Sequence, residues 1–253
     1  MAGAEQLLGP PHVQRRLAAL ADTPLNFDPA VLAGASPEDG WLVTDVCQSL
    51  PGEAPGPPAE NGSWVIARAL MRGYEFADPS IVRAYYDPGV PLAHRTMLLK
   101  LRALGIVHLY VGVRVSEVYE ETRTLGGRPV RVWGWNYQTL EGHVEMGQMD
   151  WQVWKWLDTG AVEFRVHSIS RTAHIPNPII RLGFRLVRGR ERAAFLESTK
   201  RRMRTFTELA LAEEQGAAER IADAAGDLVA RPHAGDADAD EQLAHFLDDT
   251  PRK

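Results

Sequence analysis

The hydrophobic pattern is strongest between residues 131 and 170, where apolar and polar positions alternate with the period of a β-strand. Three alternating segments, residues 131–140, 145–157 and 161–170, are separated by short sequences that contain glycine. Successive side chains of a strand point to opposite faces of a sheet, so this pattern predicts three strands. Because the connections are short, we expect neighbouring strands to be antiparallel.

Two further strands are expected upstream of this region. Residues 106–119 are rich in β-branched side chains and predict one of them. Residues 63–70, with the sequence S-W-V-I-A-R-A-L, are a candidate for the other.

Helices are expected at three places after residue 70. Residues 79–86 follow the favourable capping residue Asp78 and begin with proline. Residues 92–104 carry leucine and methionine at helical spacing and end before a glycine. A long C-terminal helix is expected at residues 191–212, where apolar residues form a stripe.

The ends of the chain differ in composition from its middle. Residues 1–60 hold nine of the seventeen prolines, so long regular elements are not expected there; residues 13–21 have helical spacing and residues 41–50 are apolar. Residues 213–253 carry eleven acidic and four basic residues, which is typical of a disordered tail. We therefore divide the chain into a Pro-rich extension (1–60), a folded domain (61–212) and an acidic tail (213–253).

This order of elements predicts an α+β fold in which a curved antiparallel sheet lies against the long C-terminal helix. A sheet wrapped on a helix can leave an apolar cavity between the two. Trp133, Trp135 and Tyr137 alternate along one strand and are expected to share a face, whereas Trp151 and Trp154 are expected on opposite faces of the next strand.

Composition and charge exclude several classes of protein. The formal net charge of −5 argues against a general nucleic-acid binder. Cys47 is the only cysteine, which excludes an internal disulfide and suits a reducing cytoplasm. No run approaches the roughly 18 apolar residues of a membrane span, and the histidines lack the spacing of a zinc motif. We therefore expect a soluble cytoplasmic protein without integral membrane association, metal or cofactor.

Three segments together resemble a known family. They are M-R-G-Y-E-F-A-D-P at residues 71–79, G-W-N-Y-Q-T-L-E-G-H-V-E-M-G-Q-M at residues 134–149, and V-E-F-R-V-H-S-I-S-R at residues 162–171. This sequence is similar to the bacterial and plant domain-of-unknown-function family numbered nineteen-ninety, over about residues 63–211. The resemblance implies a helix-grip fold like that of START proteins and the birch-pollen allergen. It implies no activity and no catalytic residue.

The sequence T-L-E-G-H-V-E at residues 139–145 carries the clearest candidate chemistry. His143 lies between two carboxylates, and Glu145 or Glu141 could orient its ring as a base or ligand anchor. The alternative is a β-turn whose polar side chains bond to nearby backbone, because Gly142 already suits a turn. No nucleophile accompanies the histidine, so His143 and Glu145 are only candidates for catalysis.

The leading hypothesis is a cavity protein, non-enzymatic or at most weakly catalytic, that binds a lipophilic small molecule between sheet and helix. The expected ligand-binding residues are Trp133, Trp135, Tyr137, Trp154 and Phe164 in the wall, with His143, Glu145 and Arg171 as polar anchors. One alternative is an enzyme that uses His143 and Glu145 as an acid–base pair. Another is a protein-interaction module that uses the basic residues between positions 181 and 204 together with the acidic tail.

Overall fold

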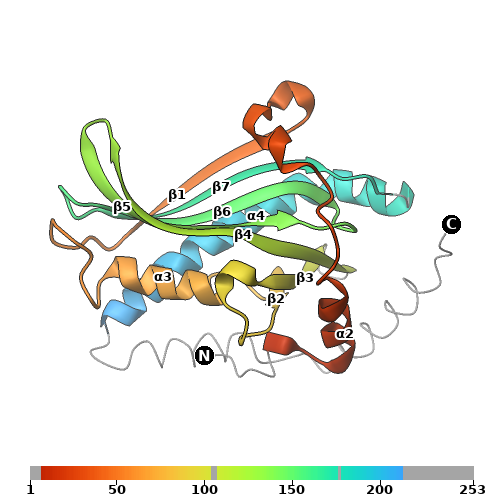
Figure 1. Ribbon diagram of the computed structural model, residues 1–253, viewed down its shortest axis with the longest axis horizontal. Coiled ribbons are helices and arrows are strands. Elements are labelled where there is room, and N and C mark those ends of the chain that lie inside the picture. Colours follow the sequence, from red (N-terminus) through yellow and green to blue (C-terminus); the bar gives the residue numbers. More distant parts are fainter. Residues whose placement is uncertain (1–6, 104–106, 176–177, 213–253) are drawn as a thin grey trace.

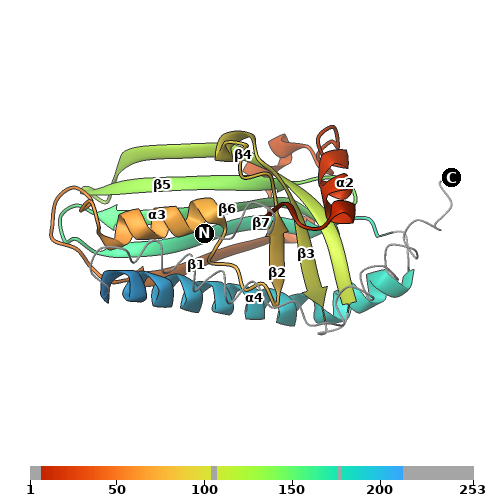
Figure 2. The same cartoon turned by 90° about the horizontal axis from the view of Figure 1, so that it is seen from below.

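A computed structural model of the protein describes residues 7–103, 107–175 and 178–212. Within these residues, seven strands form one antiparallel sheet in the order β1-β7-β6-β5-β4-β3-β2. The strands are β1 (Leu42–Leu50), β2 (Val82–Tyr85), β3 (Thr96–Ala103), β4 (Val107–Leu125), β5 (Arg128–Thr139), β6 (Glu145–Trp156) and β7 (Val162–Thr172). In Figure 2, β2 and β3 run across the direction of β5, β6 and β7, which shows how strongly the sheet curves.

Helices α3 (Ser63–Gly73) and α4 (Pro178–Ala212) cover the concave side of this sheet, whereas α2 (Pro11–Ala19) packs on the opposite face of β3. Short 3-10 helices lie at Pro29–Gly34, Pro37–Asp39 and Leu92–His94. Helix α4 runs along almost the full length of the sheet with α3 beside it, whereas α2 lies near β3 (Figure 1). The expected α+β fold, a curved antiparallel sheet held against a long C-terminal helix, is confirmed.

The strands predicted at residues 106–119, 131–140, 145–157 and 161–170 appear as β4 to β7, and the helix predicted at residues 13–21 appears as α2. The last helix begins at Pro178, which is earlier than expected.

The prediction of a strand at residues 63–70 is wrong, because this segment is the first part of helix α3. Trp64, Ala67 and Leu70 are buried at every third position, which is the face of a helix turned towards the core. The two β-branched residues between them favoured a strand, but strand preference is weak and yields to burial.

The prediction of a helix at residues 79–86 is also wrong, because residues 82–85 form strand β2. Asp78 does cap the turn that precedes this strand, since its Oδ1 accepts a hydrogen bond from the backbone N–H of Ser80 at 2.9 Å. Asp78 therefore acts as a capping residue as predicted, but after one turn the backbone becomes extended and forms β2.

The helix expected at residues 92–104 is replaced by a short 3-10 helix and strand β3. Met97 and Leu99 belong to the main core, whereas Leu98 packs with Val13 of α2 on the opposite face. A strand covered on both faces has an unbroken apolar run, which matches a helical pattern as well as it matches a strand.

Strand β1 comes from the segment assigned to the N-terminal extension. It pairs with β7 over its whole length, from Leu42 with Ser170 to Leu50 with Val162. The sheet thus takes its edge strand from before residue 60, while the division of the chain into three parts stays a prediction. The acidic tail, residues 213–253, lies outside the described residues.

The main core lies between the concave face of the sheet and helices α3 and α4. Its centre is aromatic: Trp135, Trp151, Phe76 and Phe164 are fully buried, and the rings of Phe76 and Trp151 are 4.5 Å apart. None of the helices in the described part of the chain has both the length and the apolar character needed to cross a membrane.

Candidate ligand pocket

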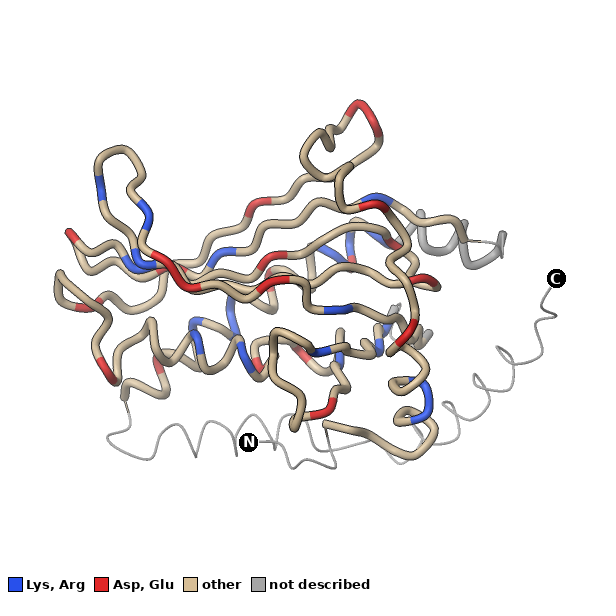
Figure 3. The backbone as a smooth tube through the Cα atoms, in the orientation of Figure 1, with Lys and Arg blue, Asp and Glu red and all other residues tan. Residues whose placement is uncertain are grey.

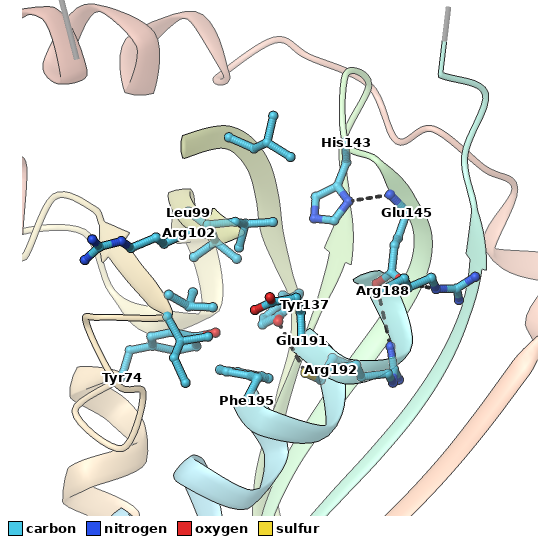
Figure 4. Close-up of a pocket in the computed structure, with 15 residues that line it drawn as sticks. Tyr74, Leu99, Arg102, Tyr137, His143, Glu145, Arg188, Glu191, Arg192 and Phe195 are labelled. Carbon is cyan, nitrogen blue, oxygen red and sulfur yellow. Dashed lines mark hydrogen bonds and ion pairs between the residues drawn. The ribbon is translucent and has the colours of Figure 1, made fainter. Parts of the chain in front are cut away.

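A cavity of about 150 Å³ lies beside this core, where β2, β3 and the β5–β6 hairpin meet α4 (Figure 4). Its wall is mainly apolar and aromatic, and is formed by Tyr74, Ile81, Val82, Leu99, Leu101, Leu109, Tyr137, Met149 and Phe195. The polar lining residues are Arg102, His143, Glu145, Arg188, Glu191 and Arg192. An apolar cavity with a few placed polar groups is the usual form of a small-molecule site.

Tyr74 enters the pocket from the C-terminal end of α3. Its backbone is left-handed, with φ 60° and ψ 24°, and its N–H closes the helix on Leu70 and Met71. For a residue with a Cβ atom this conformation costs roughly 1–2 kcal/mol. The ring packs 4.8 Å from Phe76, and burial, with Tyr137 nearby, holds the pKa of Tyr74 well above its ordinary value. Packing therefore holds a strained, neutral tyrosine in the wall.

His143 lies in the hairpin between β5 and β6, directly after Gly142, whose φ of +85° suits glycine. The backbone N–H of Glu145 donates a hydrogen bond to Nδ1 of His143 at 2.9 Å. Because Nδ1 is an acceptor, the neutral ring carries its proton on Nε2. Burial lowers the pKa of His143 to about 4, against the opposing effect of Glu145. At pH 7 the ring is therefore neutral and offers an N–H donor.

The carboxylate of Glu145 pairs with α4 and not with the imidazole. Its Oε1 lies 2.7 Å from Nε of Arg188, and its Oε2 lies 3.6 Å from Nη1 of Arg192. Arg188 also donates through Nη1 to Oγ1 of Thr172 at 2.6 Å. Of the two interpretations of this segment, the structure agrees with the turn whose polar side chain bonds to nearby backbone, and not with orientation of the His143 ring by the Glu145 carboxylate.

Arg192 is held by hydroxyl groups of the strands at the sheet edge. Its Nη atoms donate to Oγ of Ser170 at 3.2 Å, to Oγ1 of Thr44 at 3.3 Å, and to Oγ of Ser168. Burial lowers the pKa of Arg192, but a guanidinium group stays charged in proteins. The cation is therefore fixed in position at the polar end of the pocket.

The structure brings three of the predicted site residues into the pocket: Tyr137, His143 and Glu145. The hydroxyl of Tyr137 donates to Sδ of Met149 at 3.3 Å, and burial raises the pKa of Tyr137 to about 12.

Three predicted wall residues lie behind the pocket and do not line it. Trp133, Trp135 and Phe164 belong to the main core, where Trp135 and Phe164 are fully buried. Trp135 supports the wall through Tyr137, whose ring lies 6.0 Å from its own.

Two predicted site residues lie elsewhere. Trp154 is on the convex face, where the guanidinium carbon of Arg165 lies 4.0 Å above its ring. Arg171 lies over Trp41 at 4.9 Å and donates to the backbone oxygen of Asp39. Both assignments to the pocket are wrong, because strand alternation turns these side chains away from the concave face.

Four parts of the pocket are not predicted from the sequence: Tyr74, Arg188, Arg192 and the wall supplied by β2 and β3. The wall was missed because both strands were expected to be helices. The two arginines are four residues apart and so share a helix face, but their pairing with Glu145 depends on tertiary contacts.

Several charged side chains elsewhere form ion pairs. Figure 3 shows acidic and basic residues interspersed over the described chain. On α4, Lys200 pairs with Glu197 at 2.8 Å and Arg204 pairs with Glu208 at 2.7 Å. In the part of the chain that the structure describes, no group of three His, Cys, Asp or Glu side chains is placed to hold a metal ion.

Comparison with protein families matches residues 29–197 to a family described as "Domain of unknown function (DUF1990)". The match begins well before residue 63 and therefore includes β1. Comparison with curated proteins gives no match.

Among solved structures, the chain is similar to the di-domain ARO/CYC StfQ from the steffimycin biosynthetic pathway, with 11% identity and a TM-score of 0.45 over 70% of this chain. The match spans 53% of that longer chain, or about half of it. The chain is also similar to major latex-like protein 151 of Panax ginseng, with 9% identity and a TM-score of 0.42 over 66% of this chain and 97% of that one. For Ara h 8.0201 the identity is 9% and the TM-score 0.35, over 65% of this chain and 98% of that one.

Proposed function

The chain belongs to the family described as a domain of unknown function, DUF1990, and from the pocket of this member we propose that it binds a small, largely apolar molecule between its sheet and helix α4. The observation that supports this proposal is the composition of the cavity wall. Apolar and aromatic side chains from β2, β3, β5, β6 and α4 surround the cavity, and the polar groups other than Arg102 gather where the β5–β6 hairpin meets α4.

The size of the cavity limits the ligand. A cavity volume of about 150 Å³ is enough to hold a molecule of the size of benzene. We therefore propose a ligand with roughly six to ten non-hydrogen atoms inside the cavity. Ligands of this size usually have dissociation constants in the micromolar to millimolar range, because they have few atoms to contribute binding energy.

The geometry favours binding over acid–base catalysis. Nδ1 of His143 accepts a backbone hydrogen bond, and the low pKa of this ring leaves it neutral and weakly basic at pH 7. The carboxylate of Glu145 is held by two arginines. A general base needs a free lone pair within reach of the substrate and a pKa near the working pH.

Calorimetric titration with indole and toluene tests the proposal. Val82 lines the cavity and is buried, so Val82→Phe puts a ring into the space that the ligand needs. The matched control is Val43→Phe on β1, which makes the same change at a position that is 38% exposed. We expect both ligands to bind the wild type and Val43→Phe equally, and Val82→Phe at least about tenfold more weakly. Equal binding to all three proteins, or no binding to any, would overturn the proposal.

A further inference from the structure

We propose that the molecule held in this pocket carries a carboxylate, which binds where Arg188 and Arg192 meet the β5–β6 hairpin. This inference rests on the proposed function and names the chemical class of its ligand. It predicts an aromatic or short aliphatic monocarboxylate of about nine non-hydrogen atoms, of which benzoate is the simplest aromatic example.

Apart from Arg102, which lies beside Leu99, the charged groups of the pocket lie away from its apolar wall (Figure 4). In Figure 4, Glu145 and Arg188 lie on the side of the cavity opposite to Leu99 and Tyr74. A ligand that fills this cavity therefore meets an apolar wall at one end and charged groups at the other. This arrangement suits an amphipathic molecule with its polar group at one end.

The charges at the polar end do not cancel. Glu145 is the carboxylate that pairs there, and it is shared between the guanidinium groups of Arg188 and Arg192. Two positive charges thus meet one negative charge. Arg102 and Glu191 also line the pocket and carry opposite charges, so the lining as a whole keeps an excess of one positive charge.

Hydrogen-bond donors at this end also outnumber acceptors. Nη2 of Arg188 and Nε of Arg192 are buried, and in the described residues neither atom has a hydrogen-bond partner. His143 adds an Nε2–H donor, because its Nδ1 is occupied by the backbone N–H of Glu145. A buried donor without an acceptor is unfavourable, so this end favours a ligand that supplies acceptor oxygens.

A carboxylate meets both requirements. It brings one negative charge, and its two oxygens match the planar donors of a guanidinium group. In the complex, the ligand carboxylate lies beside Glu145 between the two arginines, and its apolar part lies against β2 and β3. A neutral ligand of the same shape fills the apolar part but leaves the positive charge unbalanced.

The test compares benzoate with the neutral isostere benzamide on the full chain at pH 7, by calorimetry. We expect benzoate to bind at least about tenfold more tightly, which corresponds to one charge-assisted hydrogen bond. Arg188→Met should remove this preference and keep benzamide binding. The matched control Arg165→Met removes the same charge from the convex face, where Arg165 stacks on Trp154, and should keep the preference.

A second variant guards against a folding defect. Glu145→Gln removes the carboxylate that competes for the two arginines, so benzoate affinity should rise while benzamide affinity stays the same. A protein that has lost its fold cannot show such a gain.

Equal binding of benzoate and benzamide to the wild type would overturn the carboxylate inference and leave the proposed function standing. If benzoate, benzamide, indole and toluene all fail to bind, both the inference and the proposed function are overturned. Benzenesulfonate that binds as tightly as benzoate would overturn the restriction to carboxylates.

Discussion

Nζ of Lys155 on β6 lies 2.5 Å from Oε2 of Glu53, which precedes it by 102 residues. The side chains are 1% and 5% exposed, so this is a buried ion pair. Glu53 also accepts hydrogen bonds from the backbone N–H groups of Ala59 and Trp64, at 2.9 and 2.8 Å. Burial alone would raise the pKa of Glu53, but these contacts outweigh burial and lower it. The pair therefore fixes the segment before α3 to the sheet.

Glu53→Ala should destabilise the protein by about 3–5 kcal/mol, because it leaves the charge of Lys155 buried without a partner. Urea unfolding measures the change. The control is the double variant Glu53→Ala with Lys155→Met, which removes both charges and should cost clearly less than the sum of the single changes. Additive costs would show that the two residues do not stabilise each other.

The left-handed backbone of Tyr74 gives a second prediction. Tyr74→Ala and Tyr74→Gly lose the same ring, but only alanine keeps a Cβ atom in the unfavourable conformation. The glycine variant should therefore be more stable than the alanine variant by about 1 kcal/mol. The same pair at Arg68, inside helix α3, should show the opposite order by about 1 kcal/mol. If the alanine variant is more stable than the glycine variant at both positions, the backbone of Tyr74 is not strained.

The prediction of the sheet from sequence succeeded where one face is apolar and the other polar. On β6, Trp151 and Val153 face the core while Trp154 and Trp156 face outwards, and this alternation is visible without a structure. It failed on β3, where α2 covers the outer face and the run of apolar residues is unbroken.

The candidate site was predicted only in part, because its partners are far apart in the sequence. His143 and Glu145 share one turn with Gly142, so local reasoning found them. Their actual contacts, an imidazole bonded to backbone and a carboxylate bonded to α4, depend on how the last helix docks. No local pattern distinguishes an arginine that points into the pocket from one on a solvated helix face.

The placement of Trp154 on the convex face gives a third prediction. Trp154→Phe should change indole affinity by less than about twofold, because this ring does not line the pocket. Tyr137→Ala should weaken indole binding by about tenfold or more, because Tyr137 lines the wall. Calorimetry on the two variants checks this, with a thermal melt to establish that each is folded. A larger effect at Trp154 than at Tyr137 would restore the original assignment.

The low pKa of His143 predicts how stability depends on pH. The ordinary pKa is 6.5 and that of the folded protein is about 4, so between these values the unfolded chain binds more protons. The contribution of neutral His143 to the free energy of unfolding is therefore fully present above pH 6.5. It is lost as the pH drops towards 4, by about 2 to 3 kcal/mol for this half-buried group.

The variant His143→Asn tests this contribution, because asparagine cannot titrate and its Oδ1 can still accept the hydrogen bond from the backbone of Glu145. Urea unfolding of both proteins from pH 7 to pH 4 should show the wild type losing more stability than the variant by this amount, while contributions common to both, such as that of Glu53, cancel in the difference. Parallel curves would mean that the ring titrates alike in the folded and unfolded chain, and that His143 is not held in its neutral form by the fold.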